Sequence, residues 1–190
     1  NSVAVAGDTL LVADDAIYYV SGSVNLTKTG TSSNPITVKA APGASPIFDA
    51  SSGTFVDDSD PIIQFNSTGN WWTFIGLTFQ NIHTETHKGY GMYLGNGGTR
   101  GLLVSACSFI NIYQAAIALG GGSHTVENSL FYNCCMRNEN GNSGSAGNPA
   151  VIGTNVANAS PPSNLIVRYN TIYNSWGEGV AMSHTNSAIV

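Results

Sequence analysis

The sequence predicts an all-β fold, a single-stranded right-handed parallel β-helix (a solenoid) of roughly five to seven coils. Three observations predict it. A block of ten residues recurs four times, a short apolar segment bounded by small residues follows each copy, and charged residues make up only 9% of the 190 residues. An ordinary globular domain has about 25% charged residues, so this chain relies instead on Gly, Ser, Thr, Asn and apolar residues.

The repeated block ends on asparagine, and a large apolar residue stands two positions before that asparagine. The four copies span residues 72–81, 102–111, 124–133 and 165–174. Apolar residues alternate with other residues on both sides of a short break, which is the pattern of two strands joined by a bend. The copies recur at irregular intervals, so we expect one block per coil, with connecting loops of variable length.

The final asparagines of the blocks predict a buried ladder at a turn, because equivalent side chains of stacked coils lie above one another. Their amides can hydrogen-bond to one another and to the turn backbone. The alternative, in which each asparagine is a separate turn residue, does not explain the recurring register. The predicted ladder consists of Asn81, Asn111, Asn133 and Asn174, with a column of Phe79, Phe109, Phe131 and Ile172 beside it.

A third strand is predicted after each block, and it closes the coil. The segments are residues 91–95, 116–120, 150–153 and 179–183, and Gly, Asn or Ser punctuates their boundaries. We expect one β-helix domain over residues 1–190, open or truncated at its C-terminal end, where the next coil would begin without a cap.

Composition and charge exclude several classes of function. The formal net charge is −5, and six Lys and Arg residues cannot form a stripe that follows a phosphate backbone, so we expect no nucleic-acid partner. No apolar run reaches the roughly 18 residues of a membrane-spanning helix. Residue 1 is Asn rather than Met, which is typical of a processed or excised piece.

The cysteines and the glycosylation sequons are the residues relevant to the cellular compartment of the protein. The cysteines are Cys107, Cys134 and Cys135. Because they are odd in number and two are adjacent, we favour free thiols that pack as small apolar side chains. The Asn-x-Ser/Thr sequons start at Asn25, Asn66 and Asn158, which are the candidates for glycosylation. We expect the chain to be secreted, either extracellular or at the cell surface.

Further segments carry a resemblance to known proteins. They are residues 7–10 (Gly-Asp-Thr-Leu), 26–43, 46–51 (Pro-Ile-Phe-Asp-Ala-Ser) and 126–134. These segments resemble the pectin-lyase-like superfamily of right-handed β-helices. The N-terminal segment is similar to the opening of the family-nine pectate lyases and of the chondroitinase-B and alginate lyases. The resemblance covers nearly the whole chain and implies a fold more specifically than an activity, because the fold hosts many functions.

The resemblance implies a lyase chemistry that the sequence does not fully support. Lyases of this superfamily remove a proton α to a uronate carboxylate with a Lys or Arg base, and Ca²⁺ or another cation neutralises the acid. The family would place a catalytic Lys shortly after the coil at 126–134, but residues 148–155 contain none. If the chain is an enzyme, it is polysaccharide lyase-like; the sequence favours a non-enzymatic function.

Three polar clusters are weaker candidates for chemistry, and each is also explained by an ordinary exposed loop. Asp57, Asp58 and Asp60 form an oxygen-rich loop that could hold Ca²⁺, which would be an optional cofactor. A zinc site could be formed by His83, Glu85 and His87. Catalytic residues in a groove formed by long loops could be Arg137, Glu139, Arg168 and His184.

The outward-facing columns predict contact with other molecules, because they are weakly charged and partly apolar. The predicted assembly face consists of Tyr93, Ala118, Val151, Ala181, Tyr132 and Tyr173. We therefore expect a structural subunit of an extracellular filament or surface layer, which bears or contacts glycans and associates with copies of itself or with a longer parent chain. The alternative is a carbohydrate-active enzyme or binding module acting on acidic polysaccharide. A weaker alternative is a fragment of a larger adhesin.

Overall fold

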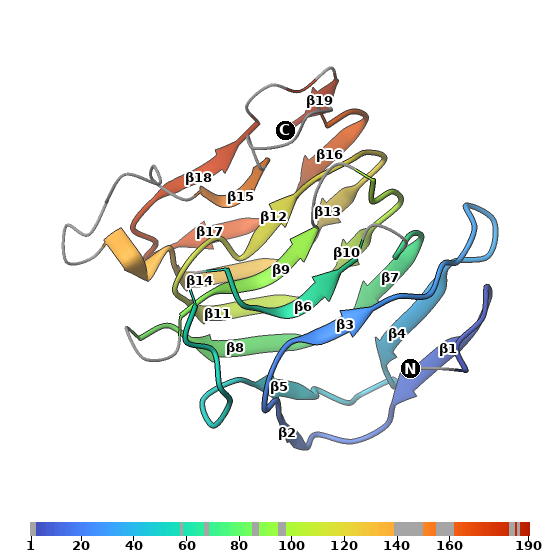
Figure 1. The fold of residues 1–190 in the computed structure, drawn as a ribbon, viewed down its shortest axis with the longest axis horizontal. Coiled ribbons are helices and arrows are strands. Elements are labelled where there is room, and N and C mark those ends of the chain that lie inside the picture. The colour runs from blue at the N-terminus through green and yellow to red at the C-terminus, as the bar shows by residue number, and fades with distance from the viewer. Residues whose placement is uncertain are drawn as a thin grey trace.

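The computed structural model describes residues 3–57, 59–66, 69–84, 88–94, 98–138, 150–154, 162–182, 185 and 187–190. The strands of these ranges form three sheets of seven, six and six strands. Figure 1 shows the strands of each sheet stacked side by side, with the two termini at opposite ends of the stack. No helix in these ranges is long and apolar enough to span a membrane.

The three sheets are called A, B and C in the order in which the chain enters them. Sheet A contains β1 (Thr9–Val12), β4 (Ile36–Ala40), β7 (Trp72–Ile75), β10 (Leu103–Ser105), β13 (Thr125–Glu127), β16 (Leu165–Arg168) and β19 (Ala188–Ile189). Sheet B contains β2 (Ile17–Tyr19), β5 (Ile47–Asp49), β8 (Thr78–Ile82), β11 (Ser108–Ile112), β14 (Leu130–Cys134) and β17 (Thr171–Tyr173). Sheet C contains β3 (Val24–Leu26), β6 (Pro61–Phe65), β9 (Tyr90–Leu94), β12 (Ile117–Leu119), β15 (Ala150–Thr154) and β18 (Glu178–Ala181). A short 3₁₀ helix, η1 (Met136–Asn138), follows β14.

Each strand pairs in parallel with its counterpart one coil earlier or later, which confirms the predicted parallel β-helix. The repeated block forms one strand of sheet A and one of sheet B, as the sequence predicted. The bend between them contains a residue with positive φ, which is Gly76 (71°), Ala106 (52°), Asn128 (51°) or Tyr169 (57°) in successive blocks. This left-handed conformation turns the chain sharply, so that each block changes sheet within two residues.

The asparagines that end the blocks form one column of side-chain hydrogen bonds. Asn111 Nδ2 donates to Asn81 Oδ1 (2.9 Å), and Asn133 Nδ2 donates to Asn111 Oδ1 (2.8 Å). Asn174 Nδ2 donates to Asn133 Oδ1 at 3.4 Å. All four have φ between 51° and 64°, a conformation that asparagine tolerates better than most residues. The prediction that all four side chains are buried was only partly correct. The first three are half-buried, and Asn174, at the end of the ladder, is exposed.

A carboxylate begins this ladder, which the sequence analysis did not predict. Asp49 Oδ2 accepts hydrogen bonds from Asn81 Nδ2 and Gln80 Nε2, both at 2.7 Å, and Asp49 Oδ1 accepts one from the Ser51 backbone N–H at 2.8 Å. Burial alone would raise the pKa of Asp49, but these hydrogen bonds hold its pKa below the ordinary value. Asp49 is therefore a charged acceptor at the end of an amide chain whose members all donate in its direction.

The aromatic column next to the ladder is a continuous stack. Ring centroids are 5.3 Å apart between Phe79 and Phe109, and 5.2 Å apart between Phe109 and Phe131. Phe48 and Tyr18 extend the stack toward the N-terminal end, each with a centroid separation of 5.4 Å from its neighbour. Offset stacks of this spacing add favourable contact to the burial of the rings themselves.

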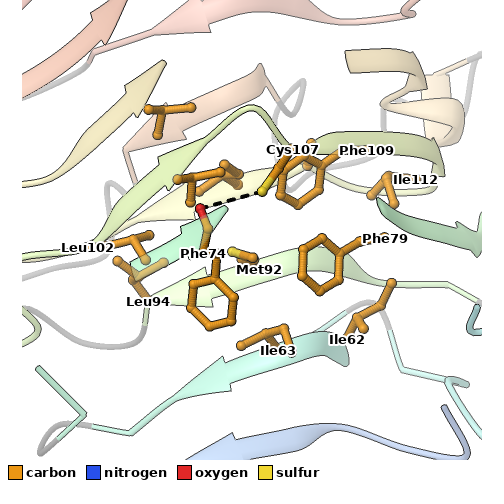
Figure 2. Close-up of a cluster of buried hydrophobic side chains, with 14 of the residues drawn as sticks. Ile62, Ile63, Phe74, Phe79, Met92, Leu94, Leu102, Cys107, Phe109 and Ile112 are labelled. Carbon is orange, nitrogen blue, oxygen red and sulfur yellow. Dashed lines mark hydrogen bonds between the residues drawn. The ribbon is translucent and has the colours of Figure 1, made fainter. Parts of the chain in front are cut away.

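The core fills the space between the three sheets. Figure 2 shows Phe79 and Phe109 with Phe74 of sheet A and Met92 of sheet C close by. The Cys107 thiol lies in the same cluster and donates to the Phe74 carbonyl at 3.6 Å. A β-carbon at Gly91 would approach the Phe109 ring to 2.8 Å, so glycine leaves room there for the aromatic stack.

One buried polar side chain bridges consecutive coils. His124 is 1% exposed, its Nδ1 accepts the Leu102 backbone N–H (3.1 Å), and its Nε2 lies 2.8 Å from the Gly120 carbonyl oxygen. This pattern requires a neutral imidazole that donates from Nε2. The pKa of His124 is lowered to about 4, mainly by burial; the Gly120 hydrogen bond opposes this shift, and the Arg100 charge adds to it.

Phe109→Ala should lower the free energy of unfolding by about 3–5 kcal/mol, because it removes the central ring of the aromatic stack and leaves a cavity. Equilibrium denaturation in urea measures the change. Ile110→Ala, one residue away on the outer face, serves as the matched control and should cost much less. Equal losses in the two variants would contradict the inward stack.

Stability should fall as the pH is lowered from about 6.5 to about 4, because in this range the unfolded chain binds a proton at residue 124 and the folded chain does not. Above pH 6.5 the contribution is fully present, and below pH 4 it is lost. The shift corresponds to roughly 3 kcal/mol. Denaturation curves of wild type and His124→Gln across this range measure the effect. The variant should be less stable at pH 7 but less dependent on pH; parallel curves would refute the assignment.

Candidate functional site

The outer face of sheet A carries two columns of side chains that run along the axis of the solenoid. The first column is rich in hydroxyl groups and consists of Thr9, Thr37, Thr73, Leu103, Thr125 and Ile166. The second column carries the charges and consists of Leu11, Lys39, Ile75, Ser105, Glu127 and Arg168. Neighbouring members of a column lie about 4.8 Å apart, the distance between paired strands.

The charged end of the second column is an ordered cluster of three side chains. Arg168 Nη2 lies 2.7 Å from Glu127 Oε2, and Arg168 Nε donates to the same oxygen at 2.9 Å. The Arg168 guanidinium carbon lies 5.5 Å from the centre of the Tyr169 ring, within the range of a cation–π interaction. The side chain of Arg168 is 49% exposed and that of Glu127 is 18% exposed. Glu127 and Tyr169 thus hold the guanidinium in one orientation while much of it faces solvent.

Arg168 was among the predicted site residues, but Glu127 and Tyr169 were not. Glu127 lies two residues after Thr125, and the period-2 alternation of a strand places both positions on the outer face. The second column could therefore have been found from the same alignment of blocks. The cation–π contact depends on the turn conformation of Tyr169 and has no comparable sequence signal.

The other predicted catalytic residues do not join Arg168 in the described part of the chain. Arg137 lies in η1, beyond the end of sheet B, whereas Arg168 ends a strand of sheet A just before sheet B begins. A strand of sheet B therefore lies between η1, which contains Arg137, and the end of β16, which contains Arg168. Figure 1 shows β14 and β17 in this position. Glu139 and His184 lie outside the described residues. The predicted groove formed by these four residues is wrong at least for Arg137.

Of the predicted metal ligands, Asp57 and Asp60 make structural contacts within their own turn. Asp60 Oδ2 accepts the backbone N–H groups of Val56 and Asp57, and Asp57 Oδ1 accepts the backbone N–H and the hydroxyl of Ser59. These bonds tighten the turn before β6, and the backbone hydrogen bond from Ser59 lowers the pKa of Asp57. Asp58, Glu85 and His87 lie outside the described residues. Within the ranges given above, no three His, Cys, Asp or Glu side chains gather as a metal site.

The predicted assembly face is only partly correct. The observed register places Tyr93, Ala118, Gly153 and Ala181 in one column. Val151 is two residues out of register and belongs to the buried core, with no exposed surface. Ala118 is only 6% exposed, so an arginine at this position would disturb the fold rather than test association.

Tyr132 and Tyr173 do lie together on the outer face of sheet B. Their ring centroids are 4.8 Å apart, and Tyr173 is 50% exposed. Gln80 and Ile110 continue the same column toward the N-terminal end. This part of the face is flat and weakly charged.

The three cysteines are not placed for catalysis, and the sequons remain candidates for glycosylation only. Cys107, Cys134 and Cys135 are free and buried, and burial raises the pKa of Cys107 to about 11 and that of Cys135 to about 12. Such thiols are poor nucleophiles at neutral pH. Asn25 and Asn66 are exposed, and glycosylation at these positions stays a prediction. Asn158 lies outside the described residues.

Comparison with solved structures identifies the fold. No protein-family model and no curated protein sequence matches the chain. A structure described as "Rhamnogalacturonan lyase" superposes with a TM-score of 0.64 over 99% of this chain, at 17% sequence identity. The chain therefore shares the parallel β-helix fold of that lyase. It spans about half of the lyase, of which 54% is covered.

Two alginate lyases are also similar to this chain but superpose poorly. The alginate lyase from Paenibacillus sp. str. FPU-7 is 15% identical, with a TM-score of 0.33 over 98% of this chain and 94% of its own. The PL6 family alginate lyase AlyGC is 13% identical, with a TM-score of 0.42 over 99% of this chain and 37% of its own. At these identities the likeness concerns the fold alone.

Proposed function

We propose that this chain is a carbohydrate-binding β-helix of the polysaccharide-lyase type, which holds an acidic polysaccharide along the outer face of sheet A. The orientation of Arg168 carries the proposal. Its guanidinium is held on one side by Glu127 and by the Tyr169 ring, and about half of the side chain faces solvent. A planar guanidinium with remaining outward N–H donors suits the carboxylate of a uronate.

Stability alone gives little reason for this cluster. An ion pair this exposed contributes about 0–1 kcal/mol to folding, because water and salt screen it. In the neighbouring column Thr9 is exposed and Thr37 and Thr125 are half-buried, so their hydroxyl groups can donate and accept hydrogen bonds, whereas Thr73 is buried. A polymer lying along the axis would meet hydroxyl groups over several coils and a cation at one end. These two features favour a sugar polymer with negative charges over a small isolated anion.

We propose binding without cleavage. A general base must lie within hydrogen-bonding reach of the proton that it removes, and it must be free to accept that proton. On the described outer columns of sheet A, the cationic side chains are Lys39 and Arg168, four strand spacings or about 19 Å apart. Arg168 keeps its proton and uses two of its donors on Glu127. This face therefore offers an anion contact without a base beside it.

Arg168→Ala should weaken binding of an acidic polysaccharide by about tenfold or more, since a hydrogen bond between charged groups contributes about 1.5–3 kcal/mol. Affinity electrophoresis in gels containing rhamnogalacturonan, polygalacturonate or alginate measures the change, with neutral galactan as the polymer control. Arg137→Ala makes the same charge change at the opposite corner of the coil and should leave affinity unchanged.

Two further readings of this experiment separate binding from catalysis. Absorbance of unsaturated uronate should not rise in the presence or absence of Ca²⁺, and a rise that depends on Arg168 would show a lyase instead. Thermal melting of each variant shows that the fold is kept. Equal retardation of wild type and Arg168→Ala would exclude sheet A as the binding face.

The second candidate is a secreted structural subunit that assembles into a filament or surface layer, in contact with glycans or bearing them at Asn25, Asn66 or Asn158. Exposed apolar side chains at both ends of the solenoid favour it. Tyr19 is 66% exposed in the first coil, and Ile189 is 65% exposed in the last strand. Edge strands with such side chains can pair with another chain. The partner would be another copy of the chain or a longer parent chain.

If the chain assembles through its ends, the double variant Tyr19→Lys, Ile189→Lys should shift it toward monomer, because it places charge on both exposed ends. Light scattering after size exclusion, across a hundredfold range of concentration, measures the mass. Tyr93→Lys on the side of sheet C is the control and should have no effect. A wild-type chain that stays monomeric throughout would exclude this candidate and leave the carbohydrate-binding function.

A further inference from the structure

A tryptophan lies outside the core at the corner where the chain enters sheet A. Trp71 immediately precedes β7, and its backbone N–H donates to the Arg100 carbonyl at 2.8 Å. The next residue, Trp72, is 5% exposed and belongs to the buried core, whereas Trp71 is half-buried and does not pack against that core. The Trp71 indole is therefore a large apolar side chain that the fold keeps out of its interior.

The backbone of this corner is left-handed in four successive coils. The register of sheet A aligns Trp71 with Gly101, Ser123 and Asn164, and the four φ angles are 57°, 71°, 58° and 53°. Glycine and asparagine tolerate this conformation, but a bulky side chain adopts it rarely and under strain. Local backbone preference thus opposes tryptophan at residue 71, which points to a role of its side chain.

The next coil leaves room for the indole. A β-carbon at Gly101 would lie 2.0 Å from Cε3, 2.4 Å from Cδ2 and 2.6 Å from Cζ3 of Trp71. These three atoms are neighbours in the six-membered ring, and their similar distances show that the ring turns a face, rather than an edge, to Gly101. Since side chains at this corner point away from the core, the ring covers Gly101 from outside and its other face is turned away from the coil.

We propose that Trp71 is a sugar-stacking residue at the edge of the sheet A face, where its outward ring face packs against the C–H side of one sugar unit. This inference rests on the proposed function and adds an uncharged contact to the charged one at Arg168. A flat aromatic ring with a polar N–H suits a sugar ring, which has apolar C–H surfaces and a rim of hydroxyl groups.

The positions of the two contacts define the kind of ligand. By the register, Arg168 is three coils from Trp71 and four positions further along the strand direction. These steps correspond to about 14 Å along the axis and about 13 Å across the sheet. A single sugar unit cannot reach both residues, so the ligand is a chain of several units. Such a chain gains affinity because its second contact forms within the complex.

Trp71→Asn tests the stacking contact, because asparagine already occupies the equivalent corner at residue 164 and suits the backbone there. Affinity electrophoresis in rhamnogalacturonan, polygalacturonate and alginate measures binding. In the polymer that retards wild type, Trp71→Asn should bind about threefold to tenfold more weakly. Trp71→Phe keeps a flat ring and should retain most of the affinity. Trp176→Asn makes the same change at a tryptophan that is 48% exposed beyond sheet B, and it should leave affinity unchanged.

Salt separates the aromatic contact from the charged one. When the ionic strength is raised from about 0.01 M to about 0.15 M, the loss caused by Arg168→Ala should shrink, because salt screens charged pairs. The loss caused by Trp71→Asn should stay the same. In addition, the polymer should shield Trp71 from acrylamide quenching, so protection should appear in the fluorescence of wild type and be missing in Trp71→Phe. This reading does not depend on the folding of the asparagine variant.

The outcomes distinguish this inference from the function on which it rests. Full affinity in Trp71→Asn, with weak binding by Arg168→Ala, would refute the stacking contact and leave the proposed function in place. A large fall in the melting temperature of Trp71→Asn, without polymer protection in wild type, would make Trp71 a structural residue of the corner. If none of the polymers retards wild type, the proposed function and the stacking contact are both wrong.

Discussion

The pairing of each strand with its counterpart one coil away is the interaction on which the rest of the structure depends. It places equivalent side chains about 4.8 Å apart, so any residue type that recurs in the block becomes a continuous column. The aromatic stack from Tyr18 to Phe131 and the amide ladder from Asp49 to Asn174 are both direct consequences. A defect in one coil changes the neighbours of the coils on both sides, so removal of the Phe109 ring should also affect the coils of Phe79 and Phe131.

The ladder shows how such a column solves the problem of polar groups at a turn. Each asparagine adopts the left-handed conformation that the corner requires, and its amide satisfies the amide of the next coil. Since every amide donates toward Asp49, the chain of hydrogen bonds ends on a negative charge, and bonds in such a chain strengthen one another. The same bonds keep Asp49 ionised. This buried carboxylate is therefore a structural element of the corner, and the outer face of sheet A remains free for recognition.

The proposed binding face follows from the same geometry. Outside sheet A, the columns bring Glu127 beside Arg168 although 41 residues separate them in the sequence. The strands that follow residues 139–149 pair in the same register as the strands before them.

The sequence by itself determined the class of fold and the register of the central blocks, because a two-residue alternation around a bend and a recurring Phe-x-Asn ending have few other structural solutions. It could also have revealed the second outer column of sheet A. Other features required the tertiary structure. Val151 was placed two residues from its true register because the long insertion before β15 hides where that strand starts. The second coil lacks the Phe-x-Asn ending because Ala50 stands at the position of the asparagine, while Asp49, aligned with Gln80, accepts the hydrogen bond from Asn81. The orientation of Arg168 depends on distances between side chains from different coils, and a local pattern of residues contains no information on those distances.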